Sequence, residues 1–143
     1  MPEFILDHGD TEHFKLFHSL DSFTQGYIEA AFFTSTGDLV AWHGDESLET
    51  ATTAEIAPTA LAAIVADCER WQKEHADTLQ EAYETETGYD AHRAGNDYWY
   101  TRNGHGTGFW DRDLGETGDM LANACRYHEV NLVRGDDGLI YFD

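Results

Sequence analysis

The residues best suited to chemistry lie in one segment, 98–112, with the sequence YWYTRNGHGTGFWDR. Histidine is the side chain most easily tuned for proton transfer near neutral pH, and arginine can orient an anion. Aromatic rings beside them could stack on a bound molecule. The segment therefore suggests a site for a small ligand or a peptide. Its candidate residues are the aromatic Trp99, Tyr100 and Trp110 and the polar Arg102, Asn103, His105 and Asp111.

Two other interpretations of segment 98–112 compete with ligand binding. The first is a catalytic loop, but its glycines neither follow a strand-to-helix pattern nor accompany the lysine of a phosphate-binding loop. No nucleophile elbow or Ser/His/Asp order is legible elsewhere in the sequence. The second is a tight β-hairpin whose aromatic residues pack a sheet against helices. The sequence favours the structural interpretation and gives no positive sign of an enzyme.

The histidines and cysteines do not predict a metal site. Three of the eight histidines are spaced by five within residues 8–18, and this spacing spreads them around a helix instead of bringing them to one face. Cys68 and Cys125 have no paired neighbour of the kind that zinc sites use. We expect both to be buried thiols, and we expect no cofactor.

Charge is the second informative feature of the chain. It has 28 acidic and 8 basic residues, a formal net charge of −20, and the excess is spread along its length. Such a charge repels nucleic acid and anionic membranes, so we expect neither as a direct partner. Its natural partners are basic or nucleic-acid-binding proteins. The alternative is that the charge serves only solubility or adaptation to high salt.

An acidic helix face is the candidate partner-binding surface. Glu74, Asp77, Glu81 and Glu84 alternate at three and four residues, which places neighbouring side chains about 5–6 Å apart. Duplex DNA carries a charge about every 1.7 Å of its axis, so other acids would have to extend this face if it mimics DNA. A merely solvated helix face is the alternative. The predicted partner-binding residues are Asp38, Asp45, Glu46, Glu49, Asp67, Glu74, Asp77, Glu81, Glu84 and Glu86.

Three helices must position these residues. Pro58 suits the first turn of the longest, which we expect to run to Thr87 as one amphipathic helix with Gly88 as its cap. Asp21 or Ser22 can cap a shorter helix. A third helix can begin at Asp113 with Glu116 in its first turn. The expected buried face of the first short helix is Phe23, Tyr27, Ile28, Ala31 and Phe32, and that of the second is Leu114, Gly118, Leu121, Cys125 and His128.

Two β-hairpins complete the predicted architecture. Asn103-Gly104 is a strong signal for a type I′ turn. It would pair Tyr100 with Thr107, Trp99 with Gly108 and Tyr98 with Phe109. The second predicted hairpin joins 130–134 to 139–142 through the turn 135–138, whose sequence is GDDG.

The sequence thus predicts one globular domain, 1–143, of the α+β class. Its architecture would be a long amphipathic helix plus two shorter helices, packed on a small antiparallel sheet made of two β-hairpins. An apolar fraction of 41% is sufficient for a buried core. The sequence has no apolar run of membrane-spanning length and no basic signal region, so we expect an intracellular protein. It leaves the oligomeric state open.

Three blocks of sequence carry a family resemblance. They are FTQGYIEAAFF at 23–33, GYDAHRAG at 88–95 and TRNGHGTGFWDR at 101–112. Together with the closing GDDGLIY at 135–141, they resemble a family of small uncharacterised proteins from bacteriophages and prophages. The resemblance covers most of the chain from Leu20 onward. It implies no particular site residues, but it implies a phage accessory protein made in the cytoplasm of an infected host cell.

Charge and resemblance together give the leading functional hypothesis. The chain would be a small acidic phage accessory protein that binds and inhibits a host nucleic-acid-binding or defence protein, such as a restriction or CRISPR component, by presenting carboxylates in place of phosphates. The alternatives are a ligand- or peptide-binding protein that uses segment 98–112, and an acidic surface that serves only solubility or salt adaptation.

Overall fold

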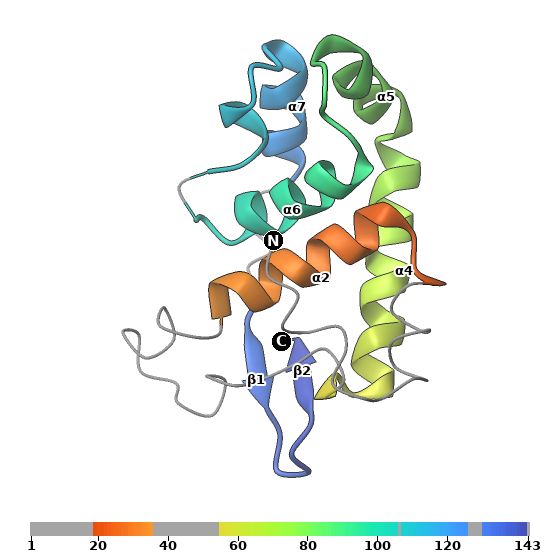
Figure 1. Ribbon diagram of the computed structural model, residues 1–143, viewed down its shortest axis with the longest axis vertical. Coiled ribbons are helices and arrows are strands. Elements are labelled where there is room, and N and C mark those ends of the chain that lie inside the picture. Colours follow the sequence, from red (N-terminus) through yellow and green to blue (C-terminus); the bar gives the residue numbers. More distant parts are fainter. Residues whose placement is uncertain (1–18, 36–54, 106, 126–129, 143) are drawn as a thin grey trace.

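The computed structural model describes residues 19–35, 55–105, 107–125 and 130–142, and in these ranges the chain is mostly helical (Figure 1). Five α-helices, one 3-10 helix and one two-stranded sheet are present in the described ranges. In chain order the elements are α2 (Ser22–Ser35), α4 (Pro58–Glu74), α5 (Ala76–Thr85), α6 (Ala91–Arg102), η3 (Phe109–Asp111), α7 (Glu116–Ala124), β1 (Leu132–Arg134) and β2 (Ile140–Phe142).

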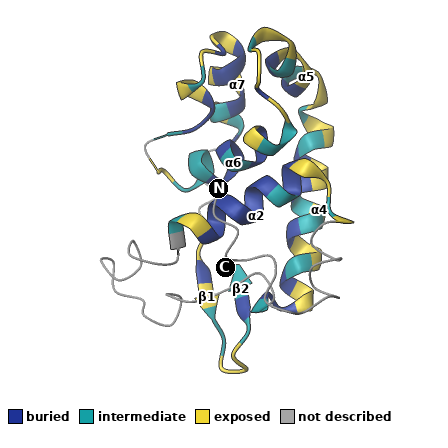
Figure 2. Ribbon diagram, in the orientation of Figure 1, coloured by how far each residue is buried: buried dark blue, intermediate teal, exposed yellow. Residues whose placement is uncertain are grey.

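Helix α2 lies at the centre of the molecule, between α6 on one side and the β1–β2 hairpin on the other (Figure 1). The Asp21 carboxylate caps it by accepting a hydrogen bond of 2.7 Å from the Thr24 amide. The predicted buried face is confirmed, since Phe23, Tyr27, Ile28, Ala31 and Phe32 are all buried. Thr24, Glu29 and Ala30 are buried as well, so the helix is enclosed on nearly every side (Figure 2).

Two glycines allow α2 and α6 to cross in direct contact. A Cβ atom on Gly95 of α6 would lie 1.9 Å from the Phe23 carbonyl oxygen, and one on Gly26 of α2 would lie 2.1 Å from the His92 carbonyl oxygen. Neither position has room for a methyl group, because both obstacles are backbone atoms. Glycine at both places therefore sets the distance between the two helices.

The core is built around stacked aromatic rings. Trp71 of α4 stacks on Tyr98 of α6 with ring centroids 4.5 Å apart, on Phe109 of η3 at 5.6 Å and on Phe23 of α2 at 5.8 Å. Such ring pairs stabilise a core beyond the area they bury. One side chain thus joins four elements that are distant in sequence.

The long helix predicted from Pro58 to Thr87 is interrupted at His75. Helix α4 ends at Glu74 and α5 begins at Ala76, with His75 at φ −119° and ψ 24° between them. The His75 ring packs on Trp71 at a centroid distance of 4.7 Å. The periodic apolar stripe still supplies buried residues on both sides of the break, with Trp71 before it and Leu79 after it. Burial of both halves therefore does not require a continuous helix.

The prediction of a hairpin at 98–112 is wrong. Residues 98–102 form the last turns of α6, and none of the three expected strand pairs exists in the described ranges. Asn103-Gly104 ends this helix: the Asn103 amide donates to the Trp99 carbonyl at 3.2 Å, and Gly104 adopts φ +66°. Left-handed backbone suits a helix C-terminus as well as a type I′ turn, so the dipeptide is compatible with either structure.

The predicted hairpin at 130–142 is confirmed. Strands β1 and β2 pair antiparallel, with Leu132 opposite Phe142 and Arg134 opposite Ile140. Gly138 in the connecting turn has φ +83°. The Ala57 amide donates to the Ile140 carbonyl at 2.9 Å, which attaches the hairpin to the start of α4.

The α+β class is therefore wrong, since the described chain is a helical domain with one small hairpin. The third predicted helix exists as α7 and buries Leu114, Leu121 and Cys125 as expected. Its N-cap is Gly115, however, and the expected cap Asp113 has a positive φ of 59°. His128 lies outside the described residues.

None of the helices in the described ranges is long and apolar enough to cross a membrane.

The Gly95 contact gives a test in which two effects have opposite signs. Alanine is favoured over glycine in a helix by about 1 kcal/mol. We nevertheless expect Gly95→Ala to lower the free energy of unfolding by about 2–3 kcal/mol, because the new methyl group forces α2 and α6 apart. Urea denaturation followed by circular dichroism measures the change.

Ala62→Gly on the exposed side of α4 is the control, and it should lose only the propensity difference of about 1 kcal/mol. A Gly95→Ala protein as stable as the unsubstituted chain would contradict the close crossing.

Candidate functional site

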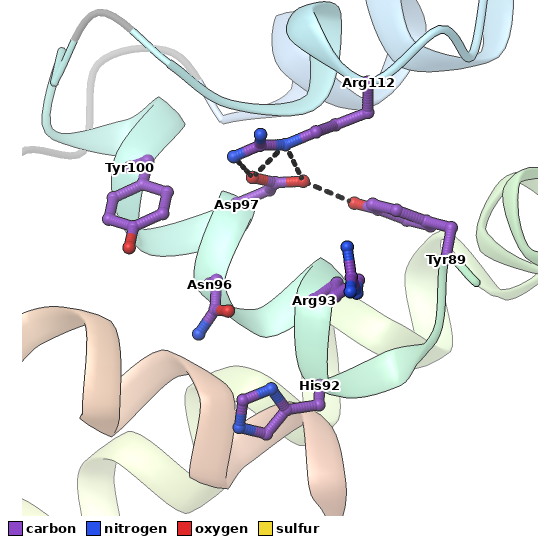
Figure 3. Close-up of a pocket in the computed structure, with 7 residues that line it drawn as sticks. All are labelled: Tyr89, His92, Arg93, Asn96, Asp97, Tyr100 and Arg112. Carbon is purple, nitrogen blue, oxygen red and sulfur yellow. Dashed lines mark hydrogen bonds and ion pairs between the residues drawn. The ribbon is translucent and has the colours of Figure 1, made fainter. Parts of the chain in front are cut away.

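A pocket of about 320 Å³ lies along the side of α6 that contains residues 92, 93, 96, 97 and 100 (Figure 3). Spacings of one, three and four residues place these side chains on neighbouring strips of one helix. The loop before α6 and the segment after η3 complete the lining. The lining residues are Tyr89, His92, Arg93, Asn96, Asp97, Tyr100 and Arg112.

A buried carboxylate, Asp97, organises one wall of the pocket. Its side chain is 1% exposed. Its Oδ1 atom accepts hydrogen bonds from Arg112 Nε at 3.0 Å and from Arg112 Nη2 at 2.8 Å. The Tyr89 hydroxyl donates to Oδ2 at 2.7 Å. Burial and the neighbouring Asp97 charge raise the pKa of Tyr89, and the hydrogen bond with Asp97 raises the pKa of Arg112. The tyrosine therefore stays neutral and the arginine stays charged.

The opposite wall attaches α6 to α2. His92 Nε2 lies 3.3 Å from Glu29 Oε1, and the Glu29 side chain is only 10% exposed. The hydrogen bond with Glu29 raises the pKa of His92. Asn96 donates from Nδ2 to the Gly26 carbonyl at 2.6 Å. Both side chains are thus fixed by partners on the helix that crosses beneath them.

Arg93 differs from the other polar residues of the pocket. It is exposed, and its guanidinium makes no hydrogen bond or ion pair with any residue in the described ranges. Its amide donates to the Asp90 carboxylate at 3.0 Å, which caps α6. The pocket therefore combines the preorganised guanidinium of Arg112 with that of Arg93, which has no partner in the described part of the chain.

The central residues predicted for a ligand site belong to the core instead. Arg102, with a side chain 9% exposed, pairs with Asp67 of α4 at 2.7 Å and lies 4.8 Å from the centre of the Tyr98 ring. Trp99 is 1% exposed and donates to Thr34 at 2.8 Å. Asn103 accepts a hydrogen bond of 2.6 Å from the Val130 amide. These three residues hold elements together.

The other members of the predicted ligand site lie in different surroundings. Tyr100 lines the pocket. His105 is exposed, and its ring lies 6.1 Å from that of Tyr100. Trp110 on η3 is 46% exposed, and Asp111 accepts a hydrogen bond from Thr107 at 3.1 Å. The structure therefore does not gather the predicted set around one cavity.

The predicted acidic face is only partly described. Glu74, Asp77, Glu81 and Glu84 are exposed at the end of α4 and along α5, and Glu86 is half-buried. Asp67 is not a free surface acid, because it accepts hydrogen bonds from Arg70, Arg102 and Tyr98. The remaining four predicted acids lie outside the described residues; they are Asp38, Asp45, Glu46 and Glu49.

Neither a metal centre nor a reactive thiol emerges within the described ranges. No group of three or more His, Cys, Asp or Glu side chains there could hold a metal ion. Cys68 and Cys125 are buried and free, as expected from the sequence. Burial raises the pKa of both thiols, that of Cys125 to about 12, so neither carries the thiolate that nucleophilic chemistry requires.

Six of the pocket residues were not among the predicted site residues, namely Tyr89, His92, Arg93, Asn96, Asp97 and Arg112. The available signal was Asp90, which can cap a helix two residues after Gly88, followed by polar residues spaced three and four apart at 92, 93, 96 and 97. Comparison of the chain with models of protein families, with curated proteins and with solved structures found no match. The phage-family resemblance stays a prediction.

The Asp97 network gives a test of local stability. We expect Tyr89→Phe to lower the free energy of unfolding by about 1.5–3 kcal/mol, because the buried carboxylate loses a hydrogen bond that it receives while charged. Tyr83→Phe is the matched control. Its ring packs on Tyr89 at 6.2 Å, but its hydroxyl has no hydrogen bond in the described ranges, so we expect a change within about 0.5 kcal/mol. Equal losses in urea denaturation would contradict the assignment.

His92 should show a pH-dependent contribution to stability. Its pKa in the folded protein lies above the unfolded value of about 6.5, so the charged pair with Glu29 stabilises the fold fully below that pH. The contribution disappears as the pH rises through the folded pKa. We expect Glu29→Gln to lower the His92 pKa in an NMR titration, because the hydrogen bond with Glu29 is the main cause that raises it. Of the other influences on this pKa, Asp90 raises it, whereas Arg93 and burial lower it.

Glu69→Gln, on the exposed side of α4, should leave the His92 titration unchanged. An identical His92 pKa in the Glu29→Gln and unsubstituted proteins would refute the pair.

Proposed function

We propose that the protein is an acidic phage accessory protein that binds a basic, nucleic-acid-binding host protein and blocks its nucleic-acid site. The observation that carries the proposal is the neighbouring pair α5 and α7, neither of which contains a lysine or an arginine. These helices pack side by side at one end of the molecule (Figure 1). We call the surface of α5, η3 and α7 the α5–α7 end.

The α5–α7 end carries exposed carboxylates from segments distant in sequence. Asp77, Glu81 and Glu84 are exposed on α5, at spacings that place successive side chains about 5–6 Å apart. Exposed acids also come from η3, from the segment after it and from α7; they are Asp111, Asp113, Glu116 and Asp119. Packing of the two helices thus brings further exposed acids to the end of the molecule where the acids of α5 lie.

In the described ranges the arginines form ion pairs with other carboxylates, and none of these acids on α5 or α7 forms an ion pair. Arg70 and Arg102 both pair with Asp67, Arg112 pairs with Asp97, and Arg134 pairs with Glu55. Four arginines are therefore held by carboxylates of their own chain. Physiological salt screens charges that are more than about 8 Å apart. Attraction of a partner protein to this end therefore depends on the carboxylates exposed there and not on the net charge of the whole chain. A basic surface fits this end.

Two exposed apolar side chains would complete such an interface. Trp110 on η3 is 46% exposed and Met120 on α7 is 59% exposed. Tryptophan and methionine are enriched at the centres of protein interfaces, where they supply affinity that charges alone do not. Carboxylates around them would steer association and select a basic partner. The combination favours a protein partner over mere adaptation to salt.

The proposal can be tested by capturing partners from bacterial lysate on the immobilised protein at low and high salt, followed by mass spectrometry. We expect a nucleic-acid-binding protein whose recovery falls with salt. Its DNA affinity, measured by fluorescence anisotropy after purification, should fall when the acidic protein is added. Capture without inhibition of DNA binding, or capture of no nucleic-acid-binding protein, would contradict the proposal.

Charge variants locate the surface. We expect Glu81→Gln/Glu84→Gln to weaken binding of the captured partner about tenfold, because two exposed ion pairs contribute up to about 1 kcal/mol each. Glu69→Gln/Asp136→Asn changes the net charge equally at exposed positions on α4 and in the hairpin turn, and should leave the affinity nearly unchanged. Equal losses in both variants would show a non-specific charge effect.

A further inference from the structure

The pocket on α6 directs cationic groups toward one space. Arg93 and Arg112 extend into the region between Tyr89 and Tyr100, and His92 lies on the same side of the helix (Figure 3). We propose that this pocket binds the phosphate group of a small phosphorylated molecule. The proposal is independent of the α5–α7 end, because the two surfaces share no residue.

Arg93 provides the positive charge that the fold does not neutralise. Arg112 is balanced by Asp97, and His92 is paired with Glu29. Arg93 has no such partner in the described ranges, and its charge acts to lower the pKa of His92. The two groups therefore repel each other when His92 is protonated. A bound dianion would remove this repulsion and supply the missing partner.

Arg112 provides a donor that is already oriented. Two of its nitrogens, Nε and Nη2, are held by Asp97, while Nη1 makes no hydrogen bond in the described ranges. Its side chain is 35% exposed, so the guanidinium remains accessible from the pocket. Because its geometry is fixed by a buried carboxylate, little conformational entropy is lost when it binds a ligand oxygen.

The size and walls of the pocket favour an organic phosphate over the free ion. A volume of about 320 Å³ lies at the lower end of the range of small-molecule sites. Tyr89 and Tyr100 line it from opposite sides in this view, and their aromatic rings can contact the organic part of a ligand (Figure 3). Oxygens of a phosphate can accept hydrogen bonds from several directions, which suits donors on separate walls.

The overall charge of −20 does not exclude a small anion from this pocket. Exposed carboxylates farther away than about 8 Å are largely screened at physiological salt. The local charge is therefore set by the lining groups together with the nearby Asp90 and Asp111, whose charges act on His92 and Arg112. The same acids would still oppose a long polyanion, which must approach many of them at once. The pocket therefore selects a small phosphate compound and not a nucleic acid strand.

Isothermal titration calorimetry with adenosine monophosphate, adenosine, inorganic phosphate and acetate tests the proposal. We expect saturable binding of adenosine monophosphate, with inorganic phosphate weaker because it lacks the organic part. Adenosine and acetate should bind at least about tenfold more weakly than adenosine monophosphate, since a charged hydrogen-bonded contact is worth about that factor or more.

Arg93→Gln is the decisive variant, because Arg93 supports no other part of the described fold. We expect it to weaken adenosine monophosphate binding at least about tenfold. Arg70→Gln removes an equal charge from an exposed position on α4 and should bind like the unsubstituted protein. The proposal is overturned if no phosphate compound binds saturably, if Arg93→Gln binds unchanged, or if adenosine or acetate binds as tightly as adenosine monophosphate.

Discussion

The close crossing of α2 and α6 is the constraint on which the rest of the structure depends. Gly26 and Gly95 bring two helix backbones into contact, and this contact sets how α6 lies against the core. On one side, Tyr98 and Arg102 reach α4 and complete the aromatic core around Trp71. On another, His92 and Asn96 are held by α2 and form part of a pocket. One backbone approach therefore positions both the core and the candidate site.

Arginine has two different roles in this acidic chain, and burial distinguishes them. Arg102 is enclosed between three helices, where its charge is balanced by Asp67 and its plane lies over the Tyr98 ring. Removing a partner from such a pair would leave an uncompensated buried charge, so the pair specifies the packing of the helices. Arg93 is exposed and contributes to no such pair in the described ranges. The first kind holds the structure together, and the second is available to a ligand.

Local signals predicted those elements whose structure is decided locally. The buried face of α2, the stripe of α7 and the hairpin at 130–142 follow from periodicity and turn residues. Helix α6 was missed because Asn103-Gly104 suits a helix end and a hairpin turn equally. What decides between them is long-range: Gly95 packs on Phe23, and Glu29 contacts His92 across 63 residues of chain. The pocket was missed for the same reason, since Asp97 and Arg112 meet only after α6 has formed.

The two free cysteines have a consequence for the dynamics of the fold. Cys68 on α4 and Cys125 at the end of α7 are 0% and 1% exposed, and burial keeps both protonated. Alkylating reagents require an accessible thiolate, so neither thiol can react while the surrounding helices remain closed. The rate of modification at each position is therefore set by how often that part of the molecule opens. The chain carries, without any label, one internal reporter of opening at α4 and another at α7.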